Sequence, residues 1–139
     1  MNAFSSYEEL LDQPCDPNGW SDDGVLLAAE RLRTFDAEAW DSLRGTWPVK
    51  SENWQFHCAD SLSDGDPHYS IPILLDMIRS CTDRVRTIAC DALRVVMQAR
   101  SVPLEIDKDL FQIICRLGQA SSGLSAKSIQ QLLSRLAVT

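Results

Sequence analysis

A segment of the chain repeats itself after 31 residues, and this repeat is the feature that most restricts the possible fold. The stretch WQFHCADSL begins at Trp54, and the stretch VRTIACDAL begins at Val85. The two share an Asp at their seventh position and a Leu at their ninth, and small Ala and Cys residues occupy the fifth and sixth positions of both. A fixed period of this size is typical of arrays in which one supersecondary unit stacks on further copies. The repeat therefore predicts a stacked array.

The hydrophobic pattern of the second copy indicates an amphipathic helix. With about 100° between successive residues, the apolar side chains between Val85 and Val96 form one stripe, and Asp91 lies outside it. We expect the first copy to follow the same register, with these side chains on its buried stripe: Trp54, His57, Cys58, Ser61 and Leu62. The segments before the two copies repeat as well, because Leu43 aligns with Leu74 at the same offset. The repeating unit is therefore a helical hairpin.

Capping residues and turn signals predict seven or eight helices and no strand, in a single all-α domain that spans residues 1–139. The expected helix starts are Ser5 or Ser6, Ser21 or Asp22, Asp36, Ser51, Ser70 and Thr82, and two more helices are expected within residues 107–117 and 125–136. Leu26, Ala29 and Leu32 should share one face of their helix. Pro72 should lie in the first turn of its helix, where a missing amide hydrogen does no harm.

The segment from Ile71 to Val96, IPILLDMIRSCTDRVRTIACDALRVV, resembles a HEAT repeat. A proline in the first helix, a Leu-rich stripe, a short polar turn and a Val-Arg pair at the start of the second helix carry the resemblance, through Pro72, Val85, Arg86, Ala89 and Leu93. Ser80 stands where the family usually has an Asp, and the hairpins within residues 39–63 and 107–136 are more divergent. The resemblance implies a short right-handed α-solenoid of about three HEAT-like hairpins with an N-terminal cap.

The cluster of His57, Cys58 and Asp60 suggests a metal site or a nucleophilic thiol, but its spacing does not fit a helix. Adjacent side chains diverge by about 100°, whereas two ligands on one helix need a spacing of three or four residues. The only other histidine is His68, and no nucleotide-binding, metalloprotease or hydrolase motif occurs. The five cysteines are scattered, which favours reduced thiols over a disulfide framework. We therefore expect no enzyme, no catalytic residue, no metal site and no cofactor.

The charge of the chain is divided unevenly between its halves. Residues 1–70 carry fourteen Asp and Glu against four Lys and Arg, a net charge of −10, and residues 71–139 carry a net charge of +3. An acidic surface repels phosphates and attracts basic proteins, so we expect a protein partner rather than nucleic acid or a membrane. The candidate contacts are the acidic residues of this half, with the loop residue Trp20 as an aromatic anchor: Asp22, Asp23, Asp36, Glu38, Asp41, Asp60, Asp64 and Asp66.

Small size, acidity and divergent helical repeats together resemble the immunity proteins of bacterial polymorphic toxin systems. The resemblance implies an antitoxin that binds a cognate toxin domain, such as a basic nuclease, and occludes it. The alternative is a HEAT-like adaptor or assembly factor that binds a helix or peptide of another cytosolic protein, with its interface along the Arg-rich helix from Arg84 to Arg100. The N-terminus lacks the basic start and apolar stretch of a signal peptide, so we expect a cytoplasmic protein, monomeric when free.

Overall fold

A computed structural model describes residues 2–13 and 19–139, apart from the side chains of Ser21 and Asp22. The described part is 77% helical, with eight α-helices and two short strands, so the all-α prediction is confirmed. The elements are α1 Ala3–Asp12, the π-helix η1 Trp20–Gly24, α3 Val25–Leu32, α4 Ala37–Thr46, α5 Glu52–Ser61, α6 Pro67–Ser80, α7 Asp83–Met97, β1 Leu104–Ile106, α8 Lys108–Ala120, α9 Gly123–Leu133 and β2 Leu136–Val138. Single 3₁₀ turns follow α4 (η2 Trp47–Val49) and α5 (η3 Leu62–Asp64).

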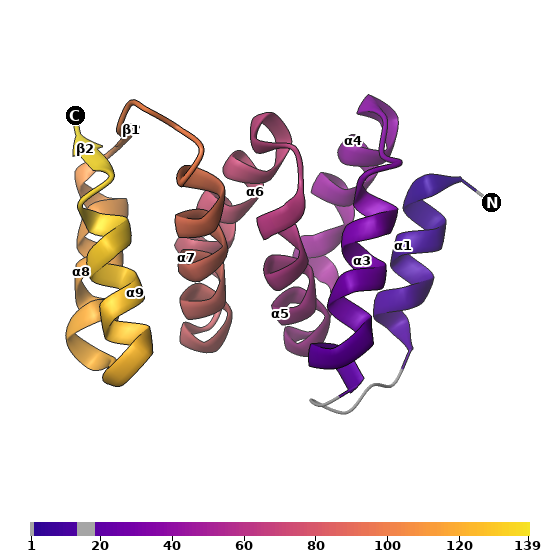
Figure 1. Cartoon of the computed structure of the whole chain (residues 1–139), viewed down its shortest axis with the longest axis horizontal. Helices are drawn as coiled ribbons and strands as arrows, with labels where there is room; N and C mark the ends of the chain where they lie inside the picture. Colours follow the sequence, from indigo (N-terminus) through magenta and orange to yellow (C-terminus); the bar gives the residue numbers. More distant parts are fainter. Residues whose placement is uncertain (1, 14–18) are drawn as a thin grey trace.

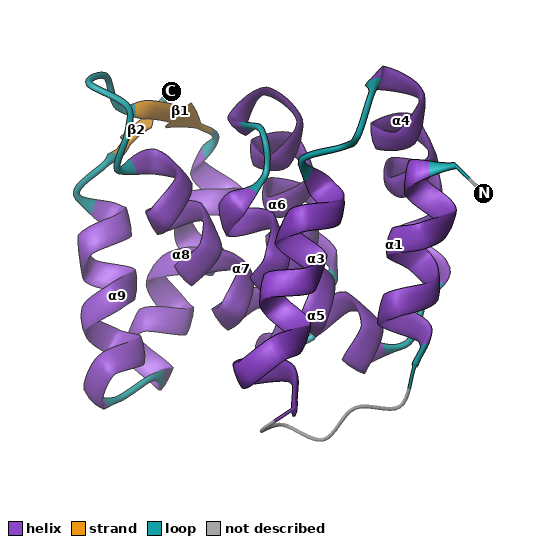
Figure 2. Cartoon of the chain, turned by 45° about the vertical axis from the view of Figure 1, so that its right-hand side comes forward, coloured by secondary structure: helices purple, strands orange, loops and turns teal. Residues whose placement is uncertain are grey.

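The helices follow one another along the long axis of the molecule in chain order, and the two termini lie at opposite ends (Figure 1). Figure 2 shows α1 and α4 at one end and α8, α9 and both strands at the other. In the middle, α7 packs against α5, α6 and α9. The helices that carry the two copies of the repeat, α5 and α7, are thus direct neighbours. Arg84 Nη1 donates a 2.9 Å hydrogen bond to Asn53 Oδ1, and these two residues occupy equivalent positions of the repeat.

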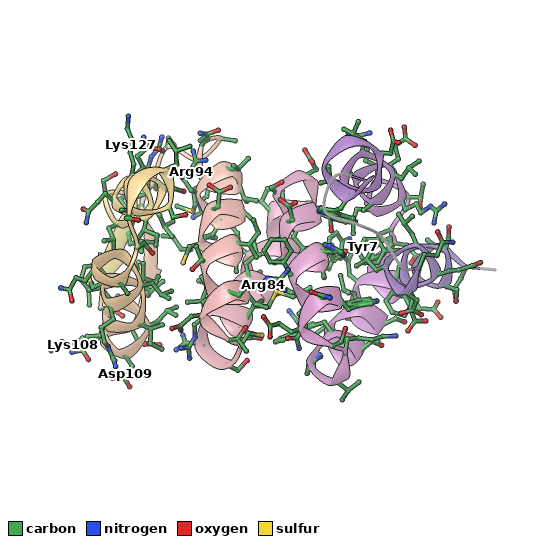
Figure 3. All side chains as sticks on the ribbon, turned by 90° about the horizontal axis from the view of Figure 1, so that it is seen from below. Tyr7, Arg84, Arg94, Lys108, Asp109 and Lys127 are labelled. Carbon is green, nitrogen blue, oxygen red and sulfur yellow. The ribbon has the colours of Figure 1, made fainter. Side chains whose placement is uncertain are left out.

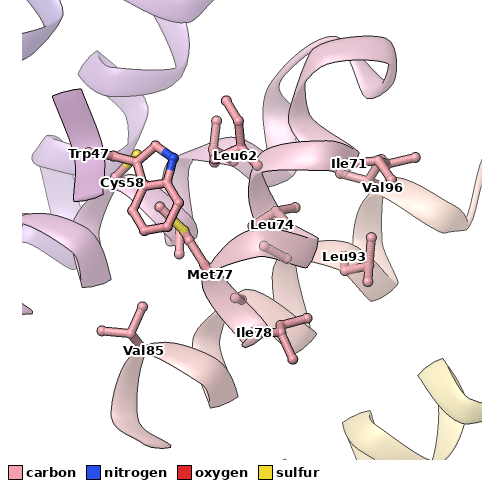
Figure 4. Close-up of a cluster of buried hydrophobic side chains, with 14 of the residues drawn as sticks. Trp47, Cys58, Leu62, Ile71, Leu74, Met77, Ile78, Val85, Leu93 and Val96 are labelled. Atoms are coloured by element: carbon pink, nitrogen blue, oxygen red, sulfur yellow. The ribbon is translucent and has the colours of Figure 1, made fainter. Parts of the chain in front are cut away.

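The repeat register also describes the core. Leu62 and Leu93 are equivalent in the two copies, and both are fully buried. Three further equivalent pairs are buried: Trp54 with Val85, Cys58 with Ala89, and Ala59 with Cys90. Figure 4 shows side chains from α5, α6 and α7 meeting around Met77 and Leu74. The expected stripe is confirmed, except that His57 and Ile88 are only half-buried.

Three of the expected caps are confirmed, and the other three expected helix starts differ in the structure. Asp36, Ser51 and Thr82 accept backbone N–H groups at the starts of α4, α5 and α7. The first helix is capped by Asn2, whose Oδ1 accepts the Ser5 amide, rather than by Ser5 or Ser6. Asn2 lies one position before the first helical residue, where its oxygen reaches the amide donors of the first turn.

The start of α6 differs most from the expectation. The helix begins at Pro67 with Asp66 as its cap, so Ser70 lies buried inside it and Pro72 falls in its interior rather than in its first turn. A proline at the first helical position needs no amide hydrogen, and the Asp66 carboxylate accepts the His68 amide at 3.0 Å. Together these two residues start the helix one turn earlier than the sequence pattern suggested.

The second helix also begins early. Gly19 has helical backbone angles, and η1 runs without a break into α3. The backbone of Ser21 and Asp22 therefore lies inside η1 rather than at the expected helix start, and their side chains lie outside the described part of the chain. The predicted loop segment from Pro14 to Asn18 lies outside the described residues. Ala29 and Leu32 are buried as expected, but Leu26 is 64% exposed. The buried stripe of α3 is formed by Ala28, Ala29 and Leu32, and Leu26 lies roughly 115° around the helix from its centre.

A parallel strand pair was not expected. Leu104 pairs with Leu136 and Ile106 with Val138, which joins the segment before α8 to the segment after α9. The Arg135 guanidinium donates to the backbone carbonyl of Arg100 at 3.1 Å and so ties this end to the end of α7. Among the helices in the described ranges, none has the length and apolar content needed to cross a bilayer.

Candidate protein-binding surfaces

Three of the predicted contact residues meet around one open hollow, which we call the acidic hollow. Asp36 comes from the connection between α3 and α4, and Asp64 and Asp66 come from the connection between α5 and α6. The hollow has a volume of about 430 Å³ and is lined by Leu32, Arg33, Phe35, Asp36, Ala37, Trp40, Asp64, Asp66 and Tyr69. The fold therefore brings together carboxylates that are nearly thirty residues apart in the chain.

The carboxylates of the acidic hollow are only partly engaged. Asp36 Oδ1 accepts the Ala39 amide at 2.9 Å, and Asp66 Oδ1 accepts the His68 amide, so each carboxylate retains a second oxygen that accepts no hydrogen bond from the described residues. Asp64 is exposed and forms no ion pair with any described residue. These oxygens can accept hydrogen bonds from a cationic group of a partner.

Aromatic rings form one wall of the acidic hollow. The rings of Trp40 and Tyr69 stack with centroids 5.3 Å apart and planes within 5° of parallel. Phe35 packs edge-on against Trp40 at 5.1 Å. Arg33, on the rim, supplies the one cation of the lining. An aromatic wall beside carboxylates is suited to a guanidinium or ammonium group, which gains from both.

The other predicted acidic contacts do not join this surface as one continuous face. Glu38 shares a smaller hollow with Asp36, and Asp41 is exposed on α4. Asp23 is exposed at the opposite end of α3, roughly 12 Å of helix away from the acidic hollow. The side chain of Asp22 lies outside the described part of the chain.

The side chains of Trp20 and Asp60 form a hydrogen bond with each other. The Trp20 indole is only 5% exposed, and its Nε1 donates to Asp60 Oδ2 at 2.9 Å. The indole also stacks on the His57 ring at 4.2 Å. Burial, with a smaller contribution from Arg84, lowers the pKa of His57. Trp20 thus lies in η1 rather than in a loop, and its side chain packs against His57 and Asp60 of α5. Its role as an anchor for a partner stays a prediction.

The thiol of Cys58 belongs to the core. It is fully buried near Tyr7, whose hydroxyl forms a 2.6 Å hydrogen bond with Ser61 Oγ, and burial raises the pKa of Cys58 to about 12. A neutral thiol without solvent access is a poor nucleophile and a poor metal ligand. In the described residues, no three His, Cys, Asp or Glu side chains are grouped so as to hold a metal ion, and the four described cysteines are free.

A second surface borders α7, within the segment from Arg84 to Arg100 where the adaptor alternative places its interface, but the sequence does not predict a groove there. An open groove of about 860 Å³, here called the α7–α9 groove, is lined by Phe56, Arg84, Thr87, Ile88, Asp91, Arg94, Leu124, Ser125, Lys127, Ser128 and Gln131. Figure 3 labels three of its cations, Arg84, Arg94 and Lys127. The positive charge of residues 71–139 was visible in the sequence, but its concentration between two helices was not.

The chain matches no protein-family model, no curated protein and no solved structure.

Proposed function

We propose that this protein is a binding module that inhibits a basic protein partner by covering the partner's cationic surface. The observation that carries the proposal is the meeting of Asp36, Asp64 and Asp66 around one hollow with an aromatic wall. The HEAT-like repeat and the acidic first half support an immunity role toward a toxin domain, such as a basic nuclease. The protein performs no chemistry in this mechanism, because its carboxylates occupy the place of the phosphates that the partner normally grips.

Charge complementarity explains how such a complex forms quickly. Opposite charges of this size steer the encounter and raise the association rate constant to ~10⁸–10⁹ M⁻¹s⁻¹ at low salt. Salt screens the attraction, since the Debye length falls to about 8 Å near physiological ionic strength. The bound state then depends on an Arg or Lys of the partner that enters the acidic hollow and contacts Tyr69 and Asp64.

The proposal is tested by capturing the partner from the native host and measuring its association at two salt concentrations. We expect the captured partner to be a basic protein that loses its activity when this protein binds it. Its association rate constant should fall sharply as the salt concentration rises. Co-expression should protect cells from the partner's toxicity. An acidic or neutral partner, or an association rate indifferent to salt, contradicts the proposal.

Charge reversal locates the contact. Asp64→Lys changes an exposed acid of the acidic hollow that accepts no capping hydrogen bond, whereas Asp36 and Asp66 are needed as helix caps. The variant should lower the association rate constant by roughly tenfold at low salt and weaken protection. The matched control is Asp76→Lys, an exposed acid on α6 outside the lining of the acidic hollow, which should leave both unchanged. Equal effects of Asp76→Lys and Asp64→Lys rule out the acidic hollow as the contact.

A further inference from the structure

The shape of the α7–α9 groove is suited to binding a helix. Its lining residues recur every three or four positions on each wall, at Arg84, Thr87–Ile88, Asp91 and Arg94 on α7 and at Leu124, Lys127–Ser128 and Gln131 on α9. This spacing means that one face of each helix borders the groove. The stretch from Arg84 to Arg94 rises about 15 Å, which is the length of roughly three turns of a docked helix.

The charge of the groove is opposite to that of the whole chain. Arg84, Arg94 and Lys127 contribute three cations and Asp91 one carboxylate, in a protein of net charge −7. The Asp91 carboxylate is already used, because Arg94 Nη2 donates to its Oδ1 at 3.0 Å and Ser128 Oγ donates to the same oxygen at 2.7 Å. The Asp91 carboxylate therefore links α7 to α9 and has little remaining capacity to bind a partner.

Two of the three cations are open to an incoming carboxylate. Lys127 is exposed, and none of the ion pairs within the described chain includes it. Arg84 lies over the Phe56 ring at 4.2 Å, donates a 2.9 Å hydrogen bond to Asn53 Oδ1 and faces Glu52 across a 3.5 Å pair. Asn53 and Glu52 are both exposed, so these contacts compete with water and are weak. Lys127 therefore has no ion-pair partner within the described chain, and Arg84 has only exposed ones.

Apolar side chains complete the lining. Leu124 is 85% exposed, and Phe56 and Ile88 are half-buried beside it. Exposed apolar groups that border a groove, with cations around them, are typical of a binding site for an amphipathic helix.

We propose that the α7–α9 groove binds an acidic amphipathic helix of a partner protein. Leu or similar residues of that helix, spaced three and four apart, contact Leu124, Ile88 and Phe56, and its Asp and Glu side chains pair with Lys127 and Arg84. A nucleic-acid strand fits less well, because the described lining combines apolar side chains with few cations, and Arg84 and Arg94 among these already contact Asn53 and Asp91. The site is distinct from the acidic hollow, so its test does not depend on the basic partner proposed there.

The test uses the full chain and three labelled probes, with binding measured by fluorescence anisotropy. The first probe is a synthetic peptide of about four helical turns with Leu on one face and Glu on the others. The second carries Lys in place of every Glu, and the third is a single-stranded oligonucleotide. We expect the acidic peptide alone to bind. No binding of the acidic peptide, equal binding of the basic peptide, or oligonucleotide binding lost in the same variants overturns the proposal.

Variants place the binding in the groove. Arg84→Glu with Lys127→Glu should weaken the acidic peptide by at least about tenfold, and Leu124→Asp should do the same, because both charge and apolar contact are needed. The matched control is Lys108→Glu, an exposed cation of α8 that Figure 3 places away from Arg94 and Lys127. The side chains of Arg84, Leu124, Lys127 and Lys108 are all exposed, so none of these changes should disturb the core. The melting temperature of each variant checks that it folds. Peptide binding that survives both groove changes, or falls equally with the control, rules the groove out.

Discussion

Tyr7, Cys58 and Ser61 form a polar group in the middle of an apolar core. All three residues are fully buried. Two hydrogen bonds join them: one between the Tyr7 hydroxyl and Ser61 Oγ, and one of 2.8 Å that Ser61 Oγ donates to the backbone carbonyl of Cys58. Buried hydroxyls are tolerated when they are paired in this way. The pKa values of Tyr7 and Cys58 are both raised, chiefly because burial disfavours their charged forms.

The raised pKa of Cys58 predicts a loss of stability at alkaline pH. Burial raises the pKa of the Cys58 thiol to about 12 from its ordinary value of 9.0, so the folded state holds its proton after the unfolded chain has lost it. Its contribution is complete below pH 9 and is lost as pH rises toward 12. Between pH 8 and pH 10 this single thiol should lower the free energy of unfolding by about 1.4 kcal/mol.

Urea denaturation at the two pH values checks this expectation. Cys58→Ala should be less stable than the wild type at pH 8 but should lose about 1.4 kcal/mol less on going to pH 10. Cys90, whose pKa burial also raises to about 12, provides a second case with the same sign. An identical pH dependence in the wild type and in Cys58→Ala contradicts the assignment of a buried neutral thiol.

The start of α6 offers a test at the level of a single element. Asp66 caps the helix, whereas Ser70 lies inside it with a buried Oγ that has no hydrogen-bond partner among the described residues. Asp66→Ala should therefore lower the free energy of unfolding by about 1 kcal/mol. Ser70→Ala should raise it by up to about 1 kcal/mol, because an unsatisfied polar atom is removed from the core.

The opposite signs of these two changes distinguish the observed helix start from the one expected from the sequence. If Ser70 were the cap, its replacement would be the costly one. Thermal melting of the two variants and the wild type, in one buffer at pH 7, gives the order directly. A loss at Ser70 as large as the loss at Asp66 contradicts the early start of α6.

The register of α7 can be tested in the same way. Leu93 is fully buried between α6 and the neighbouring helices, so Leu93→Ala should cost about 2–5 kcal/mol of stability. The control is Gln98→Ala at the exposed C-terminal cap of the same helix, which should change stability by no more than about 0.5 kcal/mol. Similar small effects at both positions contradict the register.

Asp91 is not suited to be that control, although the sequence placed it on the outer face of α7. Its carboxylate accepts hydrogen bonds from Arg94 and from Ser128 of α9, so its removal also loosens a contact between two helices. The outer face of α7 is thus partly covered by α9, which the hydrophobic pattern of α7 alone does not reveal.

The linear arrangement of helices predicts uneven stability across the whole molecule. Helix α7 packs against α5, α6 and α9, whereas α1 and α9 lie toward the two ends (Figure 1). Local opening costs least where an element has few neighbours. Amide hydrogens of α7 should therefore exchange slowest and those of α1 and α9 faster, as measured by hydrogen–deuterium exchange with mass spectrometry. Uniform protection from α1 to α9 contradicts this expectation.

The sequence alone determined the helical class, the register of the repeat and three helix caps. These properties depend on residues close together in the chain. The stripe that contains Leu93 follows from the helical period, and the caps at Asp36, Ser51 and Thr82 act on amides two or three residues away. The start of α6 was nevertheless predicted wrongly, because Asp66 and Ser70 are both residue types that commonly cap a helix. The sequence alone does not show which of the two is buried.

The tertiary structure alone decided which surfaces exist. Asp36 meets Asp64 because two helix connections lie side by side, and Trp20 is lost as a surface group because its indole reaches Asp60, forty residues away. The parallel strands and the α7–α9 groove likewise join distant segments. Charge and hydrophobicity along a chain show which residues prefer water or the core. They do not show which residues become neighbours, because that depends on how whole helices pack.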